Sequence, residues 1–264
     1  MKVLIKIGGT LLDSPESRNR LAAEIGAAVK DGLSAVVVHG GGKQVTRFLA
    51  EHGIESRFIQ GLRVTTPAVL DSVLKVLAGV VNQELVAAFI ASGSSAVGLT
   101  GMDALLAPAE PMGEELGSVG KPIPSSGQLL NLLLKNGYLP VVACLAGDRH
   151  GHFYNVNADQ MAAAVAESIE AAKLFFLTDV DGVKGQDGAI LAEMSPQCCR
   201  NLIDSGVASG GMQAKLEAAA QAVRQGLGEV RIAPGSVPDV IRKLLDGAPL
   251  GTRLVHELGR VSHG

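Results

Sequence analysis

The chain has 264 residues, enough for one large domain or two closely associated lobes, and its formal net charge is -3. With a sequence pI of about 6.1 it lacks the positive field that holds nucleic acid or an anionic membrane surface, so we expect neither partner. Hydrophobic residues make up 47% of the chain and charged residues 19%, which excludes disorder by composition. No uninterrupted apolar run reaches the length of a bilayer span, and we expect a soluble globular protein.

The cysteines indicate a reducing compartment. There are three, Cys144, Cys198 and Cys199, with no C-x-x-C pair, so neither a disulfide framework nor a cysteine zinc site is predicted. From Met1 the chain runs directly into a β-like segment, without the apolar stretch and cleavage site of a signal peptide. We therefore expect a cytoplasmic protein.

Strand and helix patterns alternate along the chain. Short runs rich in β-branched residues predict strands over 3–7, 34–39, 96–99, 139–144, 173–177 and 229–232. Helical spacing predicts helices over 16–30, 43–52, 68–79, 82–91, 127–136, 158–169, 212–225 and 237–245. In the first helix Leu21, Ile25 and Val29 mark an apolar stripe, and Ser14 before Pro15 suits a helix start. Residues 101–124 have the pattern of turns and short antiparallel strands.

This alternation predicts an α/β fold: a three-layer αβα sandwich around a central, mainly parallel sheet. The Pro- and Gly-rich stretches are too short to separate independent domains, so we expect two lobes that share one sheet. In such sheets ligands bind beyond the carboxyl ends of the strands.

Two glycine clusters follow the first two predicted strands. Lys6-Ile7-Gly8-Gly9-Thr10 ends the first, and His39-Gly40-Gly41-Gly42-Lys43 joins the second to a helix. Glycines let backbone N–H groups approach an anion, and the start of the helix adds a positive potential. Either cluster alone is better explained by a tight turn. The pair, with Lys6 beside it, favours a site that holds a phosphoryl group.

Related motifs do not fit. Gly42-Lys43 lacks the earlier glycine and the following Ser or Thr of a Walker A loop, and no third glycine completes a dinucleotide-binding motif. The segment 179–182 begins like a calcium loop, but Val183 stands at the third ligand position, so we expect a turn after a strand. His150 and His152 lack a third ligand, which favours a surface turn. No G-x-S-x-G elbow is present.

Other polar residues in apolar surroundings are Arg63, the run 155–160 and Lys215. Each has a plain structural explanation: a surface arginine, a helix cap and a solvated lysine. Asn157 is best explained as the helix cap, which leaves Asn155 and Asp159 in need of separate roles.

Five motifs in order resemble the amino acid kinase family and, within it, the acetylglutamate kinases. They are Lys-x-Gly-Gly at 6–9, His-Gly-Gly-Gly at 39–42, Gly-Leu-Arg-Val-Thr at 61–65, Asn-Val-Asn-Ala-Asp-Gln at 155–160 and Gly-Met-x-x-Lys at 211–215. Segments 137–142 and 250–252 are also similar, so the resemblance covers nearly the whole chain. It implies the amino acid kinase fold, with an N-terminal lobe (1–171) for the acyl substrate and dimer contacts and a C-terminal lobe (172–264) for ATP.

The resemblance implies transfer of the γ-phosphoryl group of ATP to the side-chain carboxylate of N-acetyl-L-glutamate, in arginine biosynthesis. Lys6 and Lys215 would flank the transferred group, and Asp159 would hold both lysines. Backbone N–H groups would come from Gly8, Gly9, Gly41 and Gly42, with Gly41 and Gly42 also at the substrate. Arg63 and Asn155 match the residues that bind the α-carboxylate of the substrate.

The nucleotide contacts implied by position are Thr178, Asp179, Val180, Asp181, Gly182, Val183, Lys184, Val207, Ala208 and Ser209. Here the chain departs from the family, because Gly210 stands where an aspartate is frequent. Magnesium is expected with ATP, and no residue is assigned as its ligand.

We expect a homodimer, with residues 68–91 as candidate contacts, although an ordinary core helix explains that segment equally well. Arginine-inhibited members carry an extra helix before the first strand. Here the first predicted strand begins at residue 3, so we expect no arginine inhibition.

Two alternatives remain: a kinase of a related acyl substrate, such as carrier-linked aminoadipate in lysine biosynthesis, and a catalytically silent amino-acid-binding regulator.

Overall fold

A computed structural model describes residues 1–256. Its centre is an eight-stranded sheet in the order β12-β14-β13-β11-β1-β2-β8-β5. The strands are β1 (Lys2–Ile7), β2 (Ser34–His39), β5 (Ala96–Thr100), β8 (Leu139–Ala143), β11 (Lys173–Thr178), β12 (Glu193–Met194), β13 (Glu229–Pro234) and β14 (Thr252–Leu254). Neighbouring strands are parallel except β13 and β14. All six predicted strands are present, and the mainly parallel sheet is confirmed.

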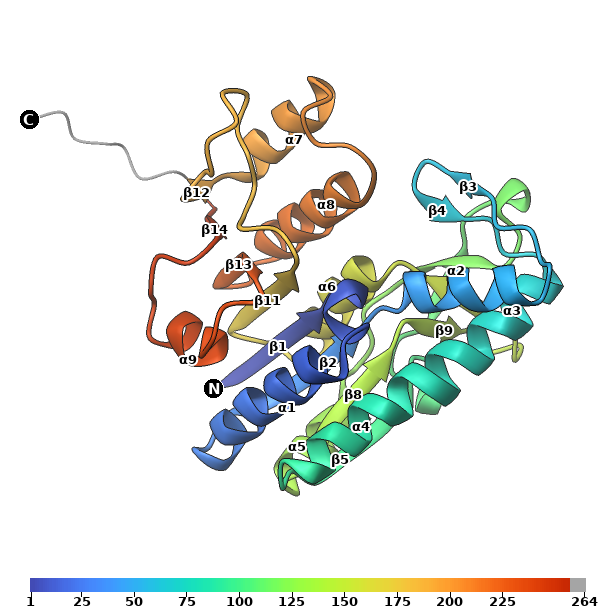
Figure 1. The fold of residues 1–264 in the computed structure, drawn as a ribbon, viewed down its shortest axis with the longest axis horizontal. Helices are drawn as coiled ribbons and strands as arrows, with labels where there is room; N and C mark the ends of the chain where they lie inside the picture. The colour runs from blue at the N-terminus through green and yellow to red at the C-terminus, as the bar shows by residue number, and fades with distance from the viewer. Residues whose placement is uncertain (257–264) are drawn as a thin grey trace, which may run out of the picture.

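Helices cover both faces of this sheet (Figure 1). They include α1 (Pro15–Lys30), α2 (Gly42–Glu51), α5 (Gln128–Lys135), α6 (Ala158–Ser168), α7 (Pro196–Asp204), α8 (Gly210–Arg224) and α9 (Val240–Leu245). On one side α1 contacts α9, and elsewhere α6 contacts both β1 and α8. As predicted, Ser14 caps α1: its hydroxyl accepts the N–H of Ser17, and Pro15 occupies the first turn.

Residues 67–91, predicted as two helices, form one. It consists of α3 (Pro67–Val73), a π-helical segment η2 (Leu74–Val81) and α4 (Asn82–Ala91). By length and composition alone this 25-residue helix could cross a membrane, although 44% of its most apolar window is buried inside the protein. The hydrophobic core includes four residues of this helix, Val69, Val73, Leu85 and Phe89. The helix therefore packs as a core helix of the protein.

Other elements were not predicted or begin elsewhere. α7 was missed because only Cys199 and Leu202 of its nine residues are buried, which leaves no long apolar stripe. α9 begins at Val240 instead of 237, since Asp239 has a left-handed backbone conformation with φ of 57°. Short 3-10 turns also occur: η1 (Gly9–Leu12), η3 (Asp103–Leu105) and η4 (Glu114–Leu116).

Two small sheets complete the architecture. One has the order β6-β7-β10-β9, from β6 (Ala109–Pro111), β7 (Val119–Pro122), β9 (Leu145–Gly147) and β10 (Phe153–Val156). Its antiparallel β6–β7 pair agrees with the pattern expected for 101–124. The other is the hairpin of β3 (Phe58–Ile59) and β4 (Leu62–Arg63), which projects from the body of the molecule (Figure 1).

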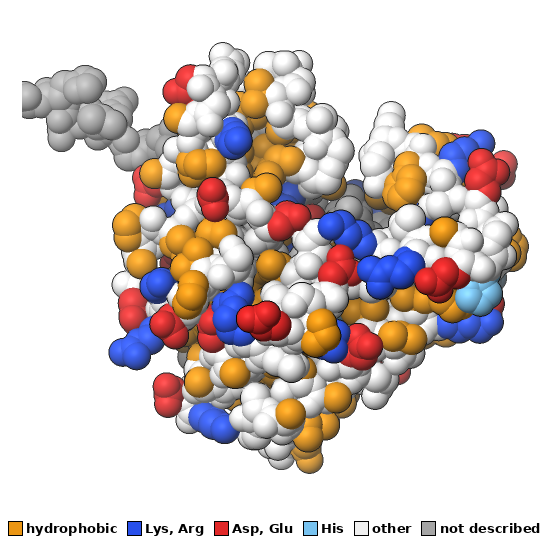
Figure 2. All heavy atoms as spheres, in the orientation of Figure 1, with side chains coloured by type: hydrophobic (Ala, Val, Ile, Leu, Met, Phe, Trp, Pro, Cys, Tyr) orange, Lys and Arg blue, Asp and Glu red, His pale blue; other side chains and the backbone are white. Residues whose placement is uncertain are grey.

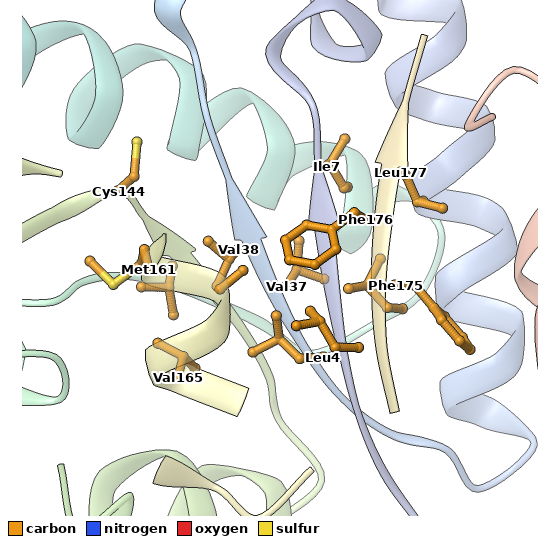
Figure 3. Packing of buried hydrophobic residues seen from close by; sticks show 14 of the residues in the cluster. Leu4, Ile7, Val37, Val38, Cys144, Met161, Val165, Phe175, Phe176 and Leu177 are labelled. Carbon is orange, nitrogen blue, oxygen red and sulfur yellow. The ribbon is translucent and has the colours of Figure 1, made fainter. Parts of the chain in front are cut away.

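The register of the central strands decides which side chains share a face. Lys6 pairs with Val38 in β2 and with Phe176 in β11, so these three side chains point to the same side. Figure 3 shows Met161 and Val165 of α6 packed near the core residues of these strands. Lys6 is therefore an ammonium group at the carboxyl end of an apolar sheet face covered by α6.

Candidate active site

The two glycine turns meet where β1 and β2 end. A Cβ atom on Gly9 would lie 3.3 Å from the backbone nitrogen of Gly41, so only residues without side chains allow this approach. Gly9 begins η1 and Gly42 begins α2, and the N–H groups that open a helix have no acceptor within it. These turns therefore form a concave backbone surface suited to an anion.

Gly8 differs from the neighbouring glycines. Its N–H donates to the carbonyl oxygen of Leu177 at 2.9 Å, so it continues the pairing of β1 with β11. The expectation that Gly8 supplies an N–H to a phosphate is therefore corrected, because that donor is already used. Gly8 does lie beside the nucleotide segment: a Cβ atom on it would be 3.7 Å from the Cα of Thr178.

A buried triad of charges lies on the sheet face below these turns. Asp159 in the first turn of α6 receives the Lys6 ammonium at 2.8 Å and the Lys215 ammonium of α8 at 3.0 Å. All three residues are 6% exposed. Lys215 also lies 5.4 Å from the centre of the Phe176 ring. Three elements that are distant in sequence thus bring together the residues that the motifs singled out.

The ionisation of this triad follows from its geometry. Burial by itself raises the pKa of Asp159, but the Coulombic attraction of Lys6 and Lys215 outweighs it and the pKa is lowered overall. Burial, reinforced by repulsion from Lys6, lowers the pKa of Lys215 to about 8, although Asp159 opposes this shift. Near neutral pH the carboxylate is ionised and Lys215 is mostly protonated.

A second group of polar residues lines a cavity of about 160 Å³ beside the glycine turns. Its wall contains Gly41, Gly42, Arg63 and Asn155, with Leu77 among the apolar residues. The Arg63 guanidinium donates to the Gly42 carbonyl at 3.0 Å and to the Thr46 hydroxyl at 2.8 Å, and it also contacts the hydroxyl of Ser56. Arg63 is 8% exposed, so the explanation as a surface arginine is wrong.

Asn155 and Asn157 have different hydrogen-bond partners. The Asn155 amide donates to the Thr65 hydroxyl at 3.0 Å, and that hydroxyl in turn donates to the Arg63 carbonyl. The side chain of Asn157 accepts the N–H groups of Asp159 and Gln160, which confirms it as the cap of α6. Lys215 is likewise no solvated helix lysine.

The expected nucleotide residues lie on two segments. Thr178 ends β11 and residues 179–184 follow it; the Thr178 hydroxyl donates to Asp179 and the Val183 N–H donates to Thr252. Val207 to Ser209 precede α8, with Ala208 buried and Val207 44% exposed. A Cβ atom on Gly61 would lie 3.8 Å from Gly210, so the β3–β4 turn approaches the start of α8. Figure 2 shows a hollow between the surfaces of these regions.

The two segments that were compared with metal-binding motifs are both turns. The segment 179–182 is a turn after β11, as predicted. His150 and His152 lie in an exposed turn, in which Asp148 accepts two backbone N–H groups and contacts the His152 ring. Within residues 1–256, no group of three or more His, Cys, Asp or Glu side chains is placed to hold a metal ion.

Sequence reasoning missed several residues that support this site. Ser56 and Thr46 hold Arg63, and Phe58 lies 4.7 Å from the Arg63 guanidinium. Nothing in their spacing marked them, because each lies on a different element. Asn82, one of several polar residues in a predominantly apolar helix, was missed as well.

Comparison with known proteins agrees with this geometry. Residues 1–234 match the profile of the amino acid kinase family, and the chain belongs to this family. Relatives named acetylglutamate kinase include the following two. That of Solibacter usitatus is 54% identical over 255 residues, 97% of this chain and 99% of the relative. That of Koribacter versatilis is 41% identical over 258 residues, again 97% and 99%.

A solved structure with a similar fold is the N-acetylglutamate synthase of Neisseria gonorrhoeae in complex with coenzyme A and N-acetyl-glutamate. It is 26% identical with a TM-score of 0.86, and the match covers 98% of this chain and 60% of that one. The fold is therefore shared with proteins of different overall length.

The buried triad predicts a pH-dependent stability. Replacing Asp159 by asparagine leaves two buried ammonium groups without a counter-charge, which should cost about 3 kcal/mol of unfolding free energy at pH 7. The folded pKa of Asp159 is lowered, so its contribution is present above the ordinary carboxyl pKa of about 4 and is lost as pH falls through the folded value. Denaturant titrations of both proteins should therefore converge in acid.

The exposed Asp71→Asn, whose side chain is 61% exposed, serves as the control and should change stability by less than about 0.5 kcal/mol. Equal stability of Asp159→Asn and wild type at pH 7 would contradict the importance of the triad.

Proposed function

We propose that the chain transfers the γ-phosphoryl group of ATP to the side-chain carboxylate of N-acetyl-L-glutamate, an acetylglutamate kinase reaction of arginine biosynthesis. The products are N-acetyl-L-glutamyl 5-phosphate and ADP. The observation that carries this proposal is the pair of ammonium groups around Asp159, placed at the carboxyl end of β1 beside the glycine turns. Relatives named acetylglutamate kinase, such as those of Solibacter usitatus and Koribacter versatilis, match nearly the whole chain and support the choice of substrate.

The chemistry needs charge stabilisation more than proton transfer. A substrate carboxylate oxygen forms a bond to the γ-phosphorus while the bond to the bridging oxygen of ADP breaks, and no proton changes place. A carboxylate is already a nucleophile, so the site needs no general base. The requirement is to bring two anions together and to stabilise charge on the phosphoryl oxygens.

Each residue group is assigned one part of that task. Lys6 and Lys215 contact the transferred phosphoryl group from two elements, and Asp159 keeps the ammonium groups in place. The N–H groups of Gly9 and Gly42 bind phosphoryl oxygens as well. Donors in fixed positions stabilise a transition state without reorganisation, which is the main source of rate enhancement in such sites.

The acyl substrate occupies the cavity lined by Gly41, Gly42, Arg63 and Asn155. The Arg63 guanidinium grips the α-carboxylate in a two-point contact, and Asn155 donates its amide to the same end of the molecule. Thr46 and Ser56 orient the guanidinium before the substrate arrives. This cavity distinguishes the substrate by its blocked amino acid backbone.

ATP is assigned to the segments after β11 and before α8, on the residues from 172 onward; 257–264 lie outside the described structure. Magnesium accompanies ATP and supplies positive charge to its phosphates. Asp159 already faces two lysines, which suits a metal held chiefly by phosphate and water oxygens. Residues 1–171 form the lobe for the acyl substrate, and the reaction takes place in the cytoplasm.

We also propose a homodimer through the helix of residues 67–91. Val80 is 53% exposed and Ile90 57%, and both lie with Ala87 on the outer surface of that helix. Exposed apolar residues in succession along a helix favour association. The other explanation, that this is an ordinary core helix, accounts for its buried face but not for Val80 and Ile90.

One alternative is a kinase of a different acyl substrate, and the other is a regulator that phosphorylates nothing. A kinase of carrier-linked aminoadipate would need a longer acyl cavity, and the observed cavity of about 160 Å³ is small. A silent regulator would have no use for two buried lysines at a phosphoryl site. Both alternatives are decided by the acceptor that the protein phosphorylates.

The first test measures acyl phosphate, trapped as the hydroxamate, with ATP and magnesium. We expect strong preference for N-acetyl-L-glutamate over free glutamate, aspartate and 2-aminoadipate derivatives, because a free amino group would bring a positive charge near Arg63 and a side chain of another length would misplace the reacting carboxylate. Preference for an aminoadipate derivative would move the protein to the alternative kinase class. Ligand binding without turnover would make it a regulator.

A second test changes Arg63 to lysine. A single ammonium group cannot make the two-point contact of a guanidinium, so KM for the acetylated amino acid should rise about 10- to 100-fold. KM for ATP should stay within about twofold. Equal changes in the two constants would mean that the cavity is wrongly assigned.

A third test addresses the dimer. Changing Val80 and Ile90 together to glutamate would place two charges in an apolar contact, so we expect a monomer by sedimentation. Leu132→Glu on α5, where Leu132 is 59% exposed, is the matched control and should leave the assembly unchanged. A wild-type monomer, or a dimer that survives the double change, would exclude this surface.

A further inference from the structure

His39 is the last residue of β2 and directly precedes the glycine turn of Gly40, Gly41 and Gly42. Its side chain is fully buried. Nδ1 of its ring lies 2.9 Å from the carbonyl oxygen of Gly40, and Nε2 lies 3.0 Å from the Asn82 amide nitrogen. The histidine therefore connects the first residue of the turn to the helix of residues 67–91.

The two contacts determine which ring nitrogen carries the proton. A carbonyl oxygen only accepts, so Nδ1 must be protonated and donate to Gly40. Nε2 is then the acceptor for the Asn82 amide. Burial lowers the pKa of His39 to about 4, so the ring is neutral at pH 7 with both nitrogens paired.

Asn82 is itself placed by an irregularity of its helix. It follows the π-helical segment, and its backbone N–H bonds to the Leu77 carbonyl, five residues back. Its side chain is buried, and the amide also donates to the Val141 carbonyl of β8 at 2.9 Å. A Cβ atom on Gly98 of β5 would be 2.2 Å from the Asn82 oxygen, so the neighbouring strand leaves space for this amide.

The π-helical segment touches the turn a second time. A Cβ atom on Gly41 would lie 2.5 Å from the Leu77 side chain and 3.4 Å from that of Val81. The turn is thus held at Gly40 by a hydrogen bond and at Gly41 by packing. The hydrogen bond to Gly40 comes from His39, which Asn82 contacts, and the packing on Gly41 comes from Leu77 and Val81 of the π-helical segment. π-Helical turns are frequent at functional sites.

We propose that His39 and Asn82 are positioning residues, which fix the glycine turn so that the N–H groups of Gly41 and Gly42 face the substrate and the transferred phosphoryl group. This inference rests on the proposed function, because it assigns the turn to that reaction. Neither residue touches a substrate. Both act through the backbone of Gly40.

A positioning role has kinetic consequences that a purely structural role lacks. In variants of His39 or Asn82 the glycine turn would adopt several orientations. The segments assigned to ATP, after β11 and before α8, would keep their structure, so KM for ATP should change less than about twofold. The transition state depends on donors in fixed positions, so kcat should fall. Complete loss of one such donor costs about 10²–10³-fold, and a loosened turn should cost about 10- to 100-fold.

The experiment compares three variants with wild type. Asn82→Leu removes the donor at similar volume, His39→Leu removes both ring contacts, and His39→Gln restores an amide that can donate and accept. Ser168→Ala is the matched control, since Ser168 is a buried hydroxyl with two hydrogen bonds that lies at the far end of α6. Each variant is assayed for kcat and both KM values at a temperature set equally far below its Tm.

We expect a fall of about 10- to 100-fold in kcat for Asn82→Leu and His39→Leu, partial recovery in His39→Gln, and less than about twofold change in Ser168→Ala. Amide hydrogen exchange of the peptide spanning 40–45, which contains the hydrogen-bonded N–H groups of Gly40 and Val45, should be faster in Asn82→Leu than in the control. Losses of kcat no larger than in Ser168→Ala, or unchanged exchange of that peptide, would overturn the proposal.

Failure of the proposed function is recognised separately. Wild-type protein without acyl phosphate formation would refute the reaction. The exchange comparison needs no substrate and would still decide whether His39 and Asn82 hold the turn.

Discussion

Two ammonium groups and one carboxylate, each 6% exposed, share a space between β1, α6 and α8. Like charges as near as these are tolerated in a protein interior only when an opposite charge lies between them. Asp159 can take that place because Asn157 caps α6 and starts the helix two residues earlier. The N-terminal end of a helix also favours a carboxylate. The position of α6 on the sheet is thus tied to the charge arrangement of the site.

The remaining parts of the site follow from the same end of the sheet. Because β1, β2 and β11 are parallel, their carboxyl ends bring Lys6, the two glycine turns and Thr178 together. Arg63 comes from a hairpin outside this sheet and reaches the turn through the Gly42 carbonyl. A single turn therefore faces the lysines on one side and the acyl cavity on the other, which explains why its orientation matters for the acyl substrate and for the transferred phosphoryl group.

The local sequence pattern was sufficient to predict most strands of the central sheet and several residues of the site. Strands such as β1 and β2 contain uninterrupted apolar runs, and an Asn before a helix predicts a cap, as at Asn157. The motif residues Lys6, Asp159 and Lys215 were singled out before their contacts were known. The contacts of His39 with Asn82 could not be predicted, because they join positions 43 residues apart through a π-helical turn that no periodicity reveals. The same holds for Ser56 and Thr46, which acquire their role only when the hairpin folds over α2.

The residues that carry the charge of the site differ from the residues that hold its glycine turn. Lys6, Lys215 and Arg63 carry positive charge toward anionic substrates, and Asp159 offsets only part of it. His39 and Asn82, which hold the glycine turn, are both neutral. They are at least as deeply buried as the charged residues of the triad. A charged histidine there would need its own counter-ion next to the phosphoryl site, and that carboxylate would repel the phosphates. Neutral hydrogen bonds fix the turn without altering the electrostatic potential that the lysines supply, so orientation and charge are provided by different residues.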